Sequence, residues 1–292
     1  MTDLALRQEI AGPGVYPDMP AETYHADPAP AADGGSLSRS GATKLIPPST
    51  PAAFDHWRRH GDDERSDAMD LGAAAHANVL TDGAGVVVVD AENWRTNAAK
   101  AARAEARARG EVAILTKDRA AVEAMATALR EHRTAGVLLA PGRGTPEASA
   151  FWRHPRTGRW CRARYDVLPR TGLGRRYVIP DYKTARDASD DAFGRAAFDH
   201  GYYMQAPWYC DGARALGIDP DPAFLFVVQE TRPPYLVNVI ELDADAIQLG
   251  RRHNAIAAAR FDRCTTDGRW PGYGDDVTLA SLPPWALKRE GI

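Results

Sequence analysis

The chain has 292 residues, of which 44% are apolar and 26% are charged, and its formal net charge is −3. These values are typical of a soluble globular protein that buries a sizeable core, in one domain with elaborations or in two. They argue against a protein that coats nucleic acid non-specifically, which would usually be basic. They allow a DNA enzyme whose acidic metal site lies inside a local basic groove.

No uninterrupted apolar run reaches the roughly 18 residues of a membrane span, and the first ten residues lack the pattern of a secretory signal. The three cysteines, Cys161, Cys210 and Cys264, are far apart and form no CxxC pair. Their odd number argues against a disulfide framework, and their scatter gives no support for a zinc or iron–sulfur site. We therefore expect a cytoplasmic protein with no membrane partner.

The first third of the chain predicts mostly helices. Residues 1–35 are rich in Pro, Gly, Ala and Asp and predict an irregular arm. "SLSRSGATKLI" predicts a helix capped by Ser36 or Ser38, and "PPSTPAAFDHWRRH" predicts a turn and a helix that begins with proline. The pattern then indicates a small-residue helix at about 67–80, a short strand in "GVVVVD", and two amphipathic helices at about 92–109 and 117–134.

The middle of the chain alternates or runs apolar between the turn signals "HPRTG" and "PRTGLG", which predicts a three-stranded meander at 147–153, 159–168 and 175–183. Two helices, two strands and a last helix are expected after it, at about 189–200, 202–216, 223–230, 235–242 and 243–263. This order favours an α+β (mixed α/β) fold with a central mixed sheet flanked by helices. We expect one domain over 36–265 with a helical insertion at about 92–134, and a Pro/Gly-rich tail over 266–292.

The stretch "PDYKTARDA" holds an acid and a lysine two positions apart, Asp181 and Lys183, in a chain with 31 arginines and only five lysines. If the last two strands of the meander form a hairpin centred on "TGLG", Asp166 lies opposite Asp181, with Cβ atoms roughly 5 Å apart. Two carboxylates that close repel each other unless a cation lies between them, and hard oxygen ligands suit Mg²⁺. Lys183 projects from the same strand face, where an ammonium can orient water and stabilise a phosphate.

The alternative, which the hairpin alone favours, is a solvated hairpin in which Asp181 and Lys183 form loose ion pairs. Pro180 lacks the N–H that a central strand needs, which indicates an edge strand or a bulge. Two further residues are candidates with structural alternatives. Glu147 is either a third carboxylate or an exposed strand-end acid, and His76 is either a metal ligand or a packed helix histidine among alanines.

Side chains that could bind a nucleic acid lie on both sides of the candidate acids in the sequence. Gln205 and Tyr209 are four residues apart on one helix face and could bind a nucleotide by hydrogen bonding and stacking, or could simply be packed. Five arginines near the meander turn could contact phosphates or could line a solvated face; they are Arg153, Arg156, Arg159, Arg162 and Arg164.

Together, these segments resemble the PD-(D/E)XK nuclease superfamily, in particular its branch of RecE-like, lambda-exonuclease-like and RecB-nuclease-like domains. The resemblance covers roughly residues 35–245 and rests on the order and spacing of four pieces. They are "LSRSGATKLI…STPAAF", "MDLGAAAHANVL", "EASAFW…GRWCRARYDVL…YVIPDYKTARDA" and "GYYMQAPWYCDGARAL". One departure is that Tyr165, not proline, precedes Asp166. The cluster-binding cysteines of some relatives are absent.

The resemblance implies site roles position by position. Asp166 and Asp181 would bind Mg²⁺, for which Mn²⁺ substitutes, together with His76 and the Tyr182 carbonyl. Lys183 would be the catalytic lysine and Glu147 an accessory acid. DNA contacts would come from four residues, Ser40, Arg164, Gln205 and Tyr209.

The same resemblance implies a function. We expect an exonuclease that hydrolyses phosphodiester bonds from double-stranded DNA ends in phage or bacterial recombination. A single-strand annealing protein and further copies of the chain are the expected partners. Two alternatives stay open: a structure-specific or single-strand endonuclease, and a non-catalytic member of the fold that binds DNA or protein.

Overall fold

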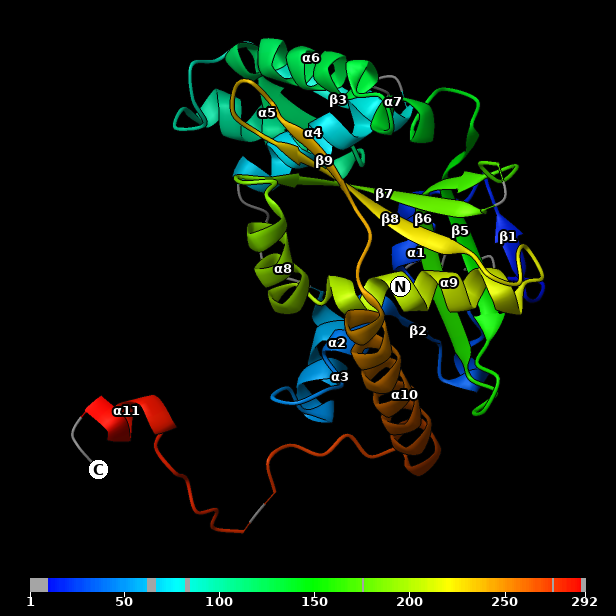
Figure 1. The fold of residues 1–292 in the computed structure, drawn as a ribbon. Coiled ribbons are helices and arrows are strands. Elements are labelled where there is room, and N and C mark those ends of the chain that lie inside the picture. Colours follow the sequence, from blue (N-terminus) through cyan, green and yellow to red (C-terminus); the bar gives the residue numbers. More distant parts are fainter. Residues whose placement is uncertain (1–9, 62–66, 82–84, 175, 275, 290–292) are drawn as a thin grey trace, which may run out of the picture.

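The computed structural model describes residues 10–61, 67–81, 85–174, 176–274 and 276–289. Within them the fold is α+β, as predicted, and three β-sheets are flanked by helices (Figure 1). The largest sheet has four strands in the order β1 (Gly14–Tyr16), β5 (Gly144–Arg153), β6 (Trp160–Pro169), β2 (Ser36–Ser38). β5 and β6 form the predicted antiparallel hairpin, in which Arg153 pairs with Trp160 across the turn.

The third predicted strand does not continue this meander. It is β7 (Val178–Ala185), which pairs in parallel with β8 (Ala223–Glu230), and β8 pairs antiparallel with β9 (Val237–Ile240). Antiparallel pairing between the chain segments around β6 and β7 is limited to a bridge from Leu173 to Arg176, one residue beyond the predicted centre. The expected hairpin was therefore wrong. All eight residues of β7 find partners on β8, whose apolar run suits a buried parallel strand.

Two helices connect β7 to β8, namely α8 (Asp190–Asp199) and α9 (Tyr202–Ala215). They make the crossover that a parallel pair of strands requires. β7 is an edge strand of its sheet, which agrees with the expectation drawn from Pro180. Figure 1 shows α9 lying across β5, β6 and β8, and its buried face includes Met204, Trp208 and Ala213.

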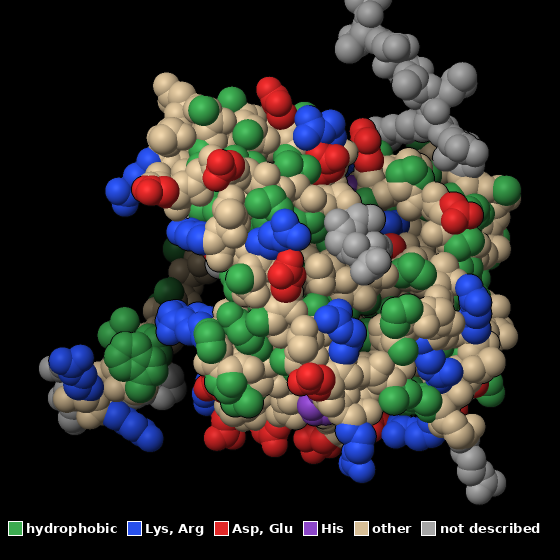
Figure 2. All heavy atoms as spheres, turned by 90° about the horizontal axis from the view of Figure 1, so that it is seen from above, with side chains coloured by type: hydrophobic (Ala, Val, Ile, Leu, Met, Phe, Trp, Pro, Cys, Tyr) green, Lys and Arg blue, Asp and Glu red, His purple; other side chains and the backbone are tan. Residues whose placement is uncertain are grey.

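A separate layer of helices and a small sheet lies above β7 in Figure 1. Its elements are α4 (Asp67–Thr81), β3 (Val86–Val89), α5 (Asn97–Ala108), β4 (Val112–Leu115), α6 (Thr116–Glu131) and α7 (Ala135–Leu138). β3 and β4 form a two-stranded parallel sheet. The sequence did not predict β4, because four apolar residues between two helices become a strand only when a partner such as β3 is available. On the outer face of this layer, basic and acidic side chains are interspersed (Figure 2).

The segment expected to be an irregular arm has more structure than predicted. Residues 10–35 contain β1, α1 (Ala21–His25) and the 3-10 turn Ala31–Asp33. Ile10 and Tyr24 pack with Phe151 and Trp160 in a buried cluster. The apolar residues of this segment are scattered among Pro and Gly without periodicity. Its packing against β5 and β6 could therefore not be predicted from the sequence.

Two short helices follow β2; the cap of the first is one of the two serines predicted, and the second begins with proline as predicted. α2 (Arg39–Thr43) is capped by Ser38, whose Oγ accepts the Gly41 N–H, and α3 (Pro51–His60) is capped by Thr50.

The last long helix, α10 (Ala244–Asp267), packs against α9, and α11 (Pro284–Arg289) follows an extended tail (Figure 1). The contact between α9 and α10 is close at Gly250, which is buried. None of the described helices combines the length and the apolar character needed to cross a bilayer.

Gly250→Ala should destabilise the protein. A Cβ atom at this position would lie 1.9 Å from the Tyr203 carbonyl oxygen, so α9 and α10 would have to move apart. We expect a loss of about 1–3 kcal/mol in the free energy of unfolding, measured by urea denaturation. Gly194→Ala in α8 is the matched control, because its Cβ would meet nothing within 4 Å. That variant should gain up to about 1 kcal/mol from helix propensity. Equal losses in both variants would contradict this account of the helix contact.

Candidate active site

The candidate carboxylates meet where the two larger sheets approach each other. The Tyr182 N–H, on the free edge of β7, donates a hydrogen bond of 2.7 Å to Oδ2 of Asp166 on β6. Asp181 is the next residue and is 2% exposed. The structure thus brings Asp166 and Asp181 together as predicted. The link is a hydrogen bond from the Tyr182 backbone N–H to the Asp166 side chain, and not the backbone hydrogen bonds of a hairpin.

Lys183 and Gln205 both contact Asp181. The Lys183 ammonium forms an ion pair with Oδ2 and lies 5.4 Å from the ring centroid of Tyr202. Gln205 Nε2 donates a hydrogen bond of 2.6 Å to Oδ1, inside the buried core of α9. Gln205 therefore fixes the carboxylate plane of Asp181, and its position differs from that of an exposed DNA-binding amide.

His76 bridges the other two candidate acids from α4. Its Nε2 lies 3.1 Å from Asp166 Oδ2, and its Nδ1 lies 3.3 Å from Glu147 Oε1. Gly72, one turn earlier on α4, lets the helix approach β7, because a Cβ there would lie 2.7 Å from Thr184 Oγ1. The small residues around His76 thus permit the close approach that the sequence indicated.

Glu147 has an unusual backbone. The Cα pairing of β5 with β6 includes Pro146–Val167 and Ala148–Tyr165 but omits the pair between them, Glu147 and Asp166. The φ of Glu147 is +52°, a left-handed value that is uncommon for a residue with a side chain. The ladder is therefore interrupted where the two acids face each other, and such strain is often found at functional sites.

The charges of these groups are strongly coupled. Burial would lower the pKa of His76, but the Asp166 and Glu147 carboxylates outweigh burial and raise it to about 9. Burial and the Asp166 carboxylate raise the pKa of Asp181 to about 6, although Lys183 opposes them. Burial would also raise the pKa of Asp166, yet His76 and Lys183 hold it below its ordinary value.

The pKa of the Lys183 amine is raised, whereas the pKa of an isolated buried lysine would be lowered. Burial would lower its pKa, but the carboxylates of Asp181 and Asp166 raise it. Lys183 is therefore a fixed ammonium at neutral pH, suited to orienting water or a phosphate and not to accepting a proton.

The residues are chemically suited to a divalent cation, although they form no ready-made cage. Across the described residues, no group of three or more His, Cys, Asp and Glu side chains converges as a metal cluster. Mg²⁺, however, commonly takes only one or two protein carboxylates and completes its shell with water and phosphate oxygens. Apart from its ion pair with Lys183, the buried Oδ2 of Asp181 has no hydrogen-bond partner in the described structure, so it can serve as a ligand.

The predicted DNA-contacting residues lie in different places. Ser40 and Tyr209 border a groove of about 750 Å³ that also includes Arg39, Arg58 and Arg59. Arg164 lies at the carboxylates, where its Nε donates to Glu147 Oε2 at 2.6 Å.

The arginines of the meander are mostly engaged within the protein. Arg153 pairs with Asp33, Arg159 with Asp262, and Arg162 with Asp27. These contacts attach the N-terminal segment and α10 to the hairpin of β5 and β6. The interpretation that they form a row of phosphate contacts therefore has little support in this conformation.

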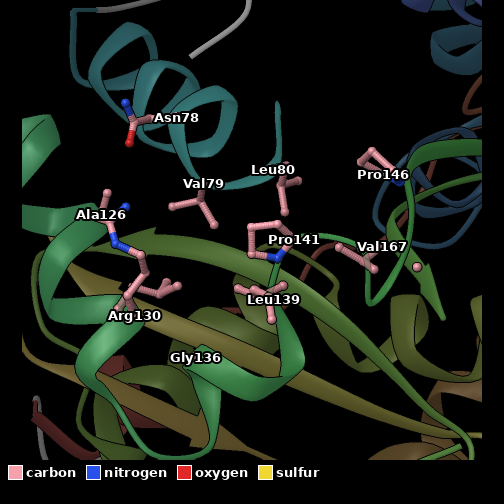
Figure 3. A pocket seen from close by; sticks show the side chains of 14 residues that line it. Asn78, Val79, Leu80, Ala126, Arg130, Gly136, Leu139, Pro141, Pro146 and Val167 are labelled. Carbon is pink, nitrogen blue, oxygen red and sulfur yellow. The ribbon is translucent and has the colours of Figure 1, made fainter. Parts of the chain in front are cut away.

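A cavity of about 330 Å³ lies between α4, α6 and the start of β5, with mostly apolar walls to which Asn78 and Arg130 add polar groups (Figure 3). Its walls include Pro146 and Val167, the immediate neighbours of Glu147 and Asp166. Figure 3 shows Val79, Leu80 and Leu139 around the same space. The cavity lining thus includes the chain neighbours of both acids but neither acid itself.

The hydrogen bonds that support Tyr182 could not be predicted from the sequence. Its hydroxyl donates to Gln229 Oε1 at 2.6 Å, and Gln229 Nε2 donates to the Met125 carbonyl at 2.8 Å. Gln229 is fully buried, which is unusual for an amide and requires such partners. A glutamine within the apolar run "AFLFVVQE" was the only signal, and it did not indicate which residue it would hold.

A family model described as a PDDEXK-like domain of unknown function (DUF3799) matches residues 42–282. A crystal structure of a "putative exonuclease" from Eubacterium rectale resembles the chain with a TM-score of 0.56 and 13% identity, covering 94% of this chain and 99% of that one. At this identity the likeness concerns the fold alone. No curated protein gives a significant match to the sequence.

In the presence of EDTA, the His76 imidazole should stay protonated past neutral pH and lose its proton near pH 9. NMR of the imidazole carbon-bound protons measures this titration, and His76→Gln assigns the signal. Asp166→Asn should move the midpoint down toward the ordinary value of about 6.5, because the neighbour that raises it most is then neutral. His154 is the internal control, since burial lowers its pKa in both proteins. A wild-type His76 midpoint at or below the ordinary value would show that the ion pairs do not form.

Proposed function

Because the chain belongs to this PDDEXK-like family, we propose that it is a divalent-metal-dependent deoxyribonuclease that degrades double-stranded DNA from its ends. One observation carries the proposal. Two strands from different sheets and a helix, all distant in sequence, bring four side chains into one connected and largely buried cluster: Lys183 pairs with Asp181, His76 pairs with Asp166, and the Tyr182 N–H links Asp166 to the strand of Asp181. A loose surface ion pair, the alternative weighed for the hairpin, would not be buried or connected in this way.

Asp166 and Asp181 would hold the cation, with the Tyr182 carbonyl and His76 as further ligands. A divalent cation at this position would polarise the scissile phosphate and lower the pKa of the attacking water. We propose Mg²⁺ as the ion, with Mn²⁺ as a substitute, because carboxylate and carbonyl oxygens suit both.

The surrounding side chains then have distinct tasks. The Lys183 ammonium would hold the attacking water and balance negative charge on the phosphate, while Gln205 keeps the Asp181 carboxylate in one orientation. Arg164 keeps the Glu147 carboxylate beside His76. Ser40 and Tyr209 would contact the DNA in the arginine-containing groove described above.

The finer parts of the proposal rest on the resemblance to RecE-like and lambda-exonuclease-like proteins. These parts are the preference for DNA ends, a role in phage or bacterial recombination, and an annealing protein and further copies of the chain as partners. The E. rectale structure supports the fold on which the proposal depends. The alternatives are a structure-specific or single-strand endonuclease and a non-catalytic binding protein.

Lys183→Ala should lower the rate of DNA cleavage in Mg²⁺ by on the order of a hundredfold or more, because the ammonium beside the phosphate is removed. Lys117→Ala is the matched control, since Lys117 is exposed on α6. Release of acid-soluble nucleotides measures the rate, and DNA binding in EDTA shows whether the variant still folds and binds. Unchanged cleavage in the Lys183 variant would reject the catalytic assignment, and no cleavage by wild type with either metal would favour the non-catalytic alternative.

Linear duplex DNA should be degraded, whereas covalently closed circular DNA of the same sequence should persist, because an exonuclease needs an end. Gel electrophoresis of both substrates with Mg²⁺, with EDTA and with Asp181→Ala makes the comparison. Asp199→Ala, an exposed acid on α8, is the control variant. Linearisation of the circle by the wild type, but not by Asp181→Ala, would establish the endonuclease alternative.

A further inference from the structure

The C-terminal tail is the most apolar exposed segment of the described chain. Nine large apolar residues are exposed across the described structure, and five of them lie between residues 273 and 285. They are Tyr273, Val277, Leu279, Leu282 and Trp285. Figure 1 shows this tail leaving the far end of α10 and placing α11 clear of the body. Such a concentration of exposed apolar surface usually marks an interaction segment.

α11 presents its apolar and basic side chains together. Trp285 is 69% exposed, and Lys288 and Arg289 follow it by three and four residues, so they share one face of the helix. Leu282, which is 66% exposed, lies two residues before the helix. A partner for this face needs an apolar groove with an acidic rim.

The body of the protein contains a groove of that kind. It has a volume of about 610 Å³ and lies between α8, β9 and the first turns of α10. Phe193, Tyr203 and Leu249 contribute apolar walls, and Phe198 is an exposed aromatic ring at 65% exposure.

The charged residues of the groove are all acidic. They are Asp190, Glu241 and Asp243, and no Lys, Arg or His lines the groove in the described structure. Outside the groove, Arg176 neutralises part of this charge through its ion pair with Glu241. Basic side chains at the end of an apolar helix would complement this rim, whereas a nucleic acid would be repelled by it.

We propose that α11 and Leu282 dock into this groove on a second copy of the chain. Trp285 would pack beside Phe198, and Lys288 and Arg289 would face the acidic rim. Because each copy carries one tail and one groove, reciprocal exchange closes a symmetric dimer with two identical contacts.

The tail is long enough for such an exchange. It leaves α10 at Gly268, about 28 Å along the helix from Leu249 in the groove. The stretch from Gly268 to Leu282 reaches up to about 46 Å when extended. The chain's own groove is also within that reach, so the experiment must separate exchange between copies from folding back.

Sedimentation velocity of the full chain should reveal a dimer, and tail and groove variants should weaken it by at least roughly tenfold in dissociation constant. The tail variant is Leu282→Ser with Trp285→Ser, and the groove variant is Phe198→Ala. Val137→Ser is the matched control, because Val137 is half exposed on α7, away from the groove. An equimolar mixture of the tail and groove variants should recover dimer, since one intact tail can still meet one intact groove.

Cross-linking identifies the contact directly. Trp285→Cys and Phe198→Cys proteins, mixed and treated with a short bismaleimide, should form a covalent heterodimer. The native Cys161, Cys210 and Cys264 are buried, so they should not react. A strictly monomeric wild type, a dimer insensitive to both variants, or cross-links confined to a single chain that carries both cysteines would overturn the proposal. These measurements are independent of DNA cleavage, so they stand or fall separately from the nuclease assignment.

Discussion

The buried carboxylate of Asp181 is the constraint around which the site is organised. A carboxylate that is 2% exposed and close to a second acid is costly unless cations and hydrogen bonds compensate for it. Lys183 supplies the charge and Gln205 supplies the hydrogen bond. His76 does the same for Asp166 and Glu147. The three carboxylates are thus balanced by Lys183, protonated His76 and Arg164, and a divalent cation in place of the His76 proton would add one positive charge, which a bound phosphate could offset.

The fold brings two strands of different sheets and one helix together at the edge of β7. β6 carries Asp166, the edge strand β7 carries Asp181 and Lys183, and α4 carries His76. The free N–H of Tyr182 joins the two sheets at this point, so an edge group that would otherwise bind water becomes part of the site. α9 covers the cluster from the other side with Gln205.

The chain uses its two kinds of basic residue differently. Arginines beside β6 hold distant segments to the sheet through paired carboxylates, as Arg159 does with Asp262 on α10. Arginine's planar fork suits such fixed pairs, whereas a lysine is a compact point charge that fits beside a single carboxylate oxygen. Lys183, one of only five lysines in the sequence, is such a point charge beside Asp181, whereas Arg153, Arg159 and Arg162 form pairs with carboxylates within the protein.

Much of the local structure was determined by the sequence itself. The class of fold, most helices and strands, the caps at Ser38 and Thr50, and the shared face of Asp181 and Lys183 follow from periodicity and turn chemistry over a few residues. The tertiary structure alone decided that β7 pairs with β8, that β4 is a strand, that Gln205 points at Asp181, and that His76 joins Glu147 to Asp166. The reason is physical: a strand's alternation records which face is buried but not which strand it pairs with. That choice depends on competition among segments far apart in the chain.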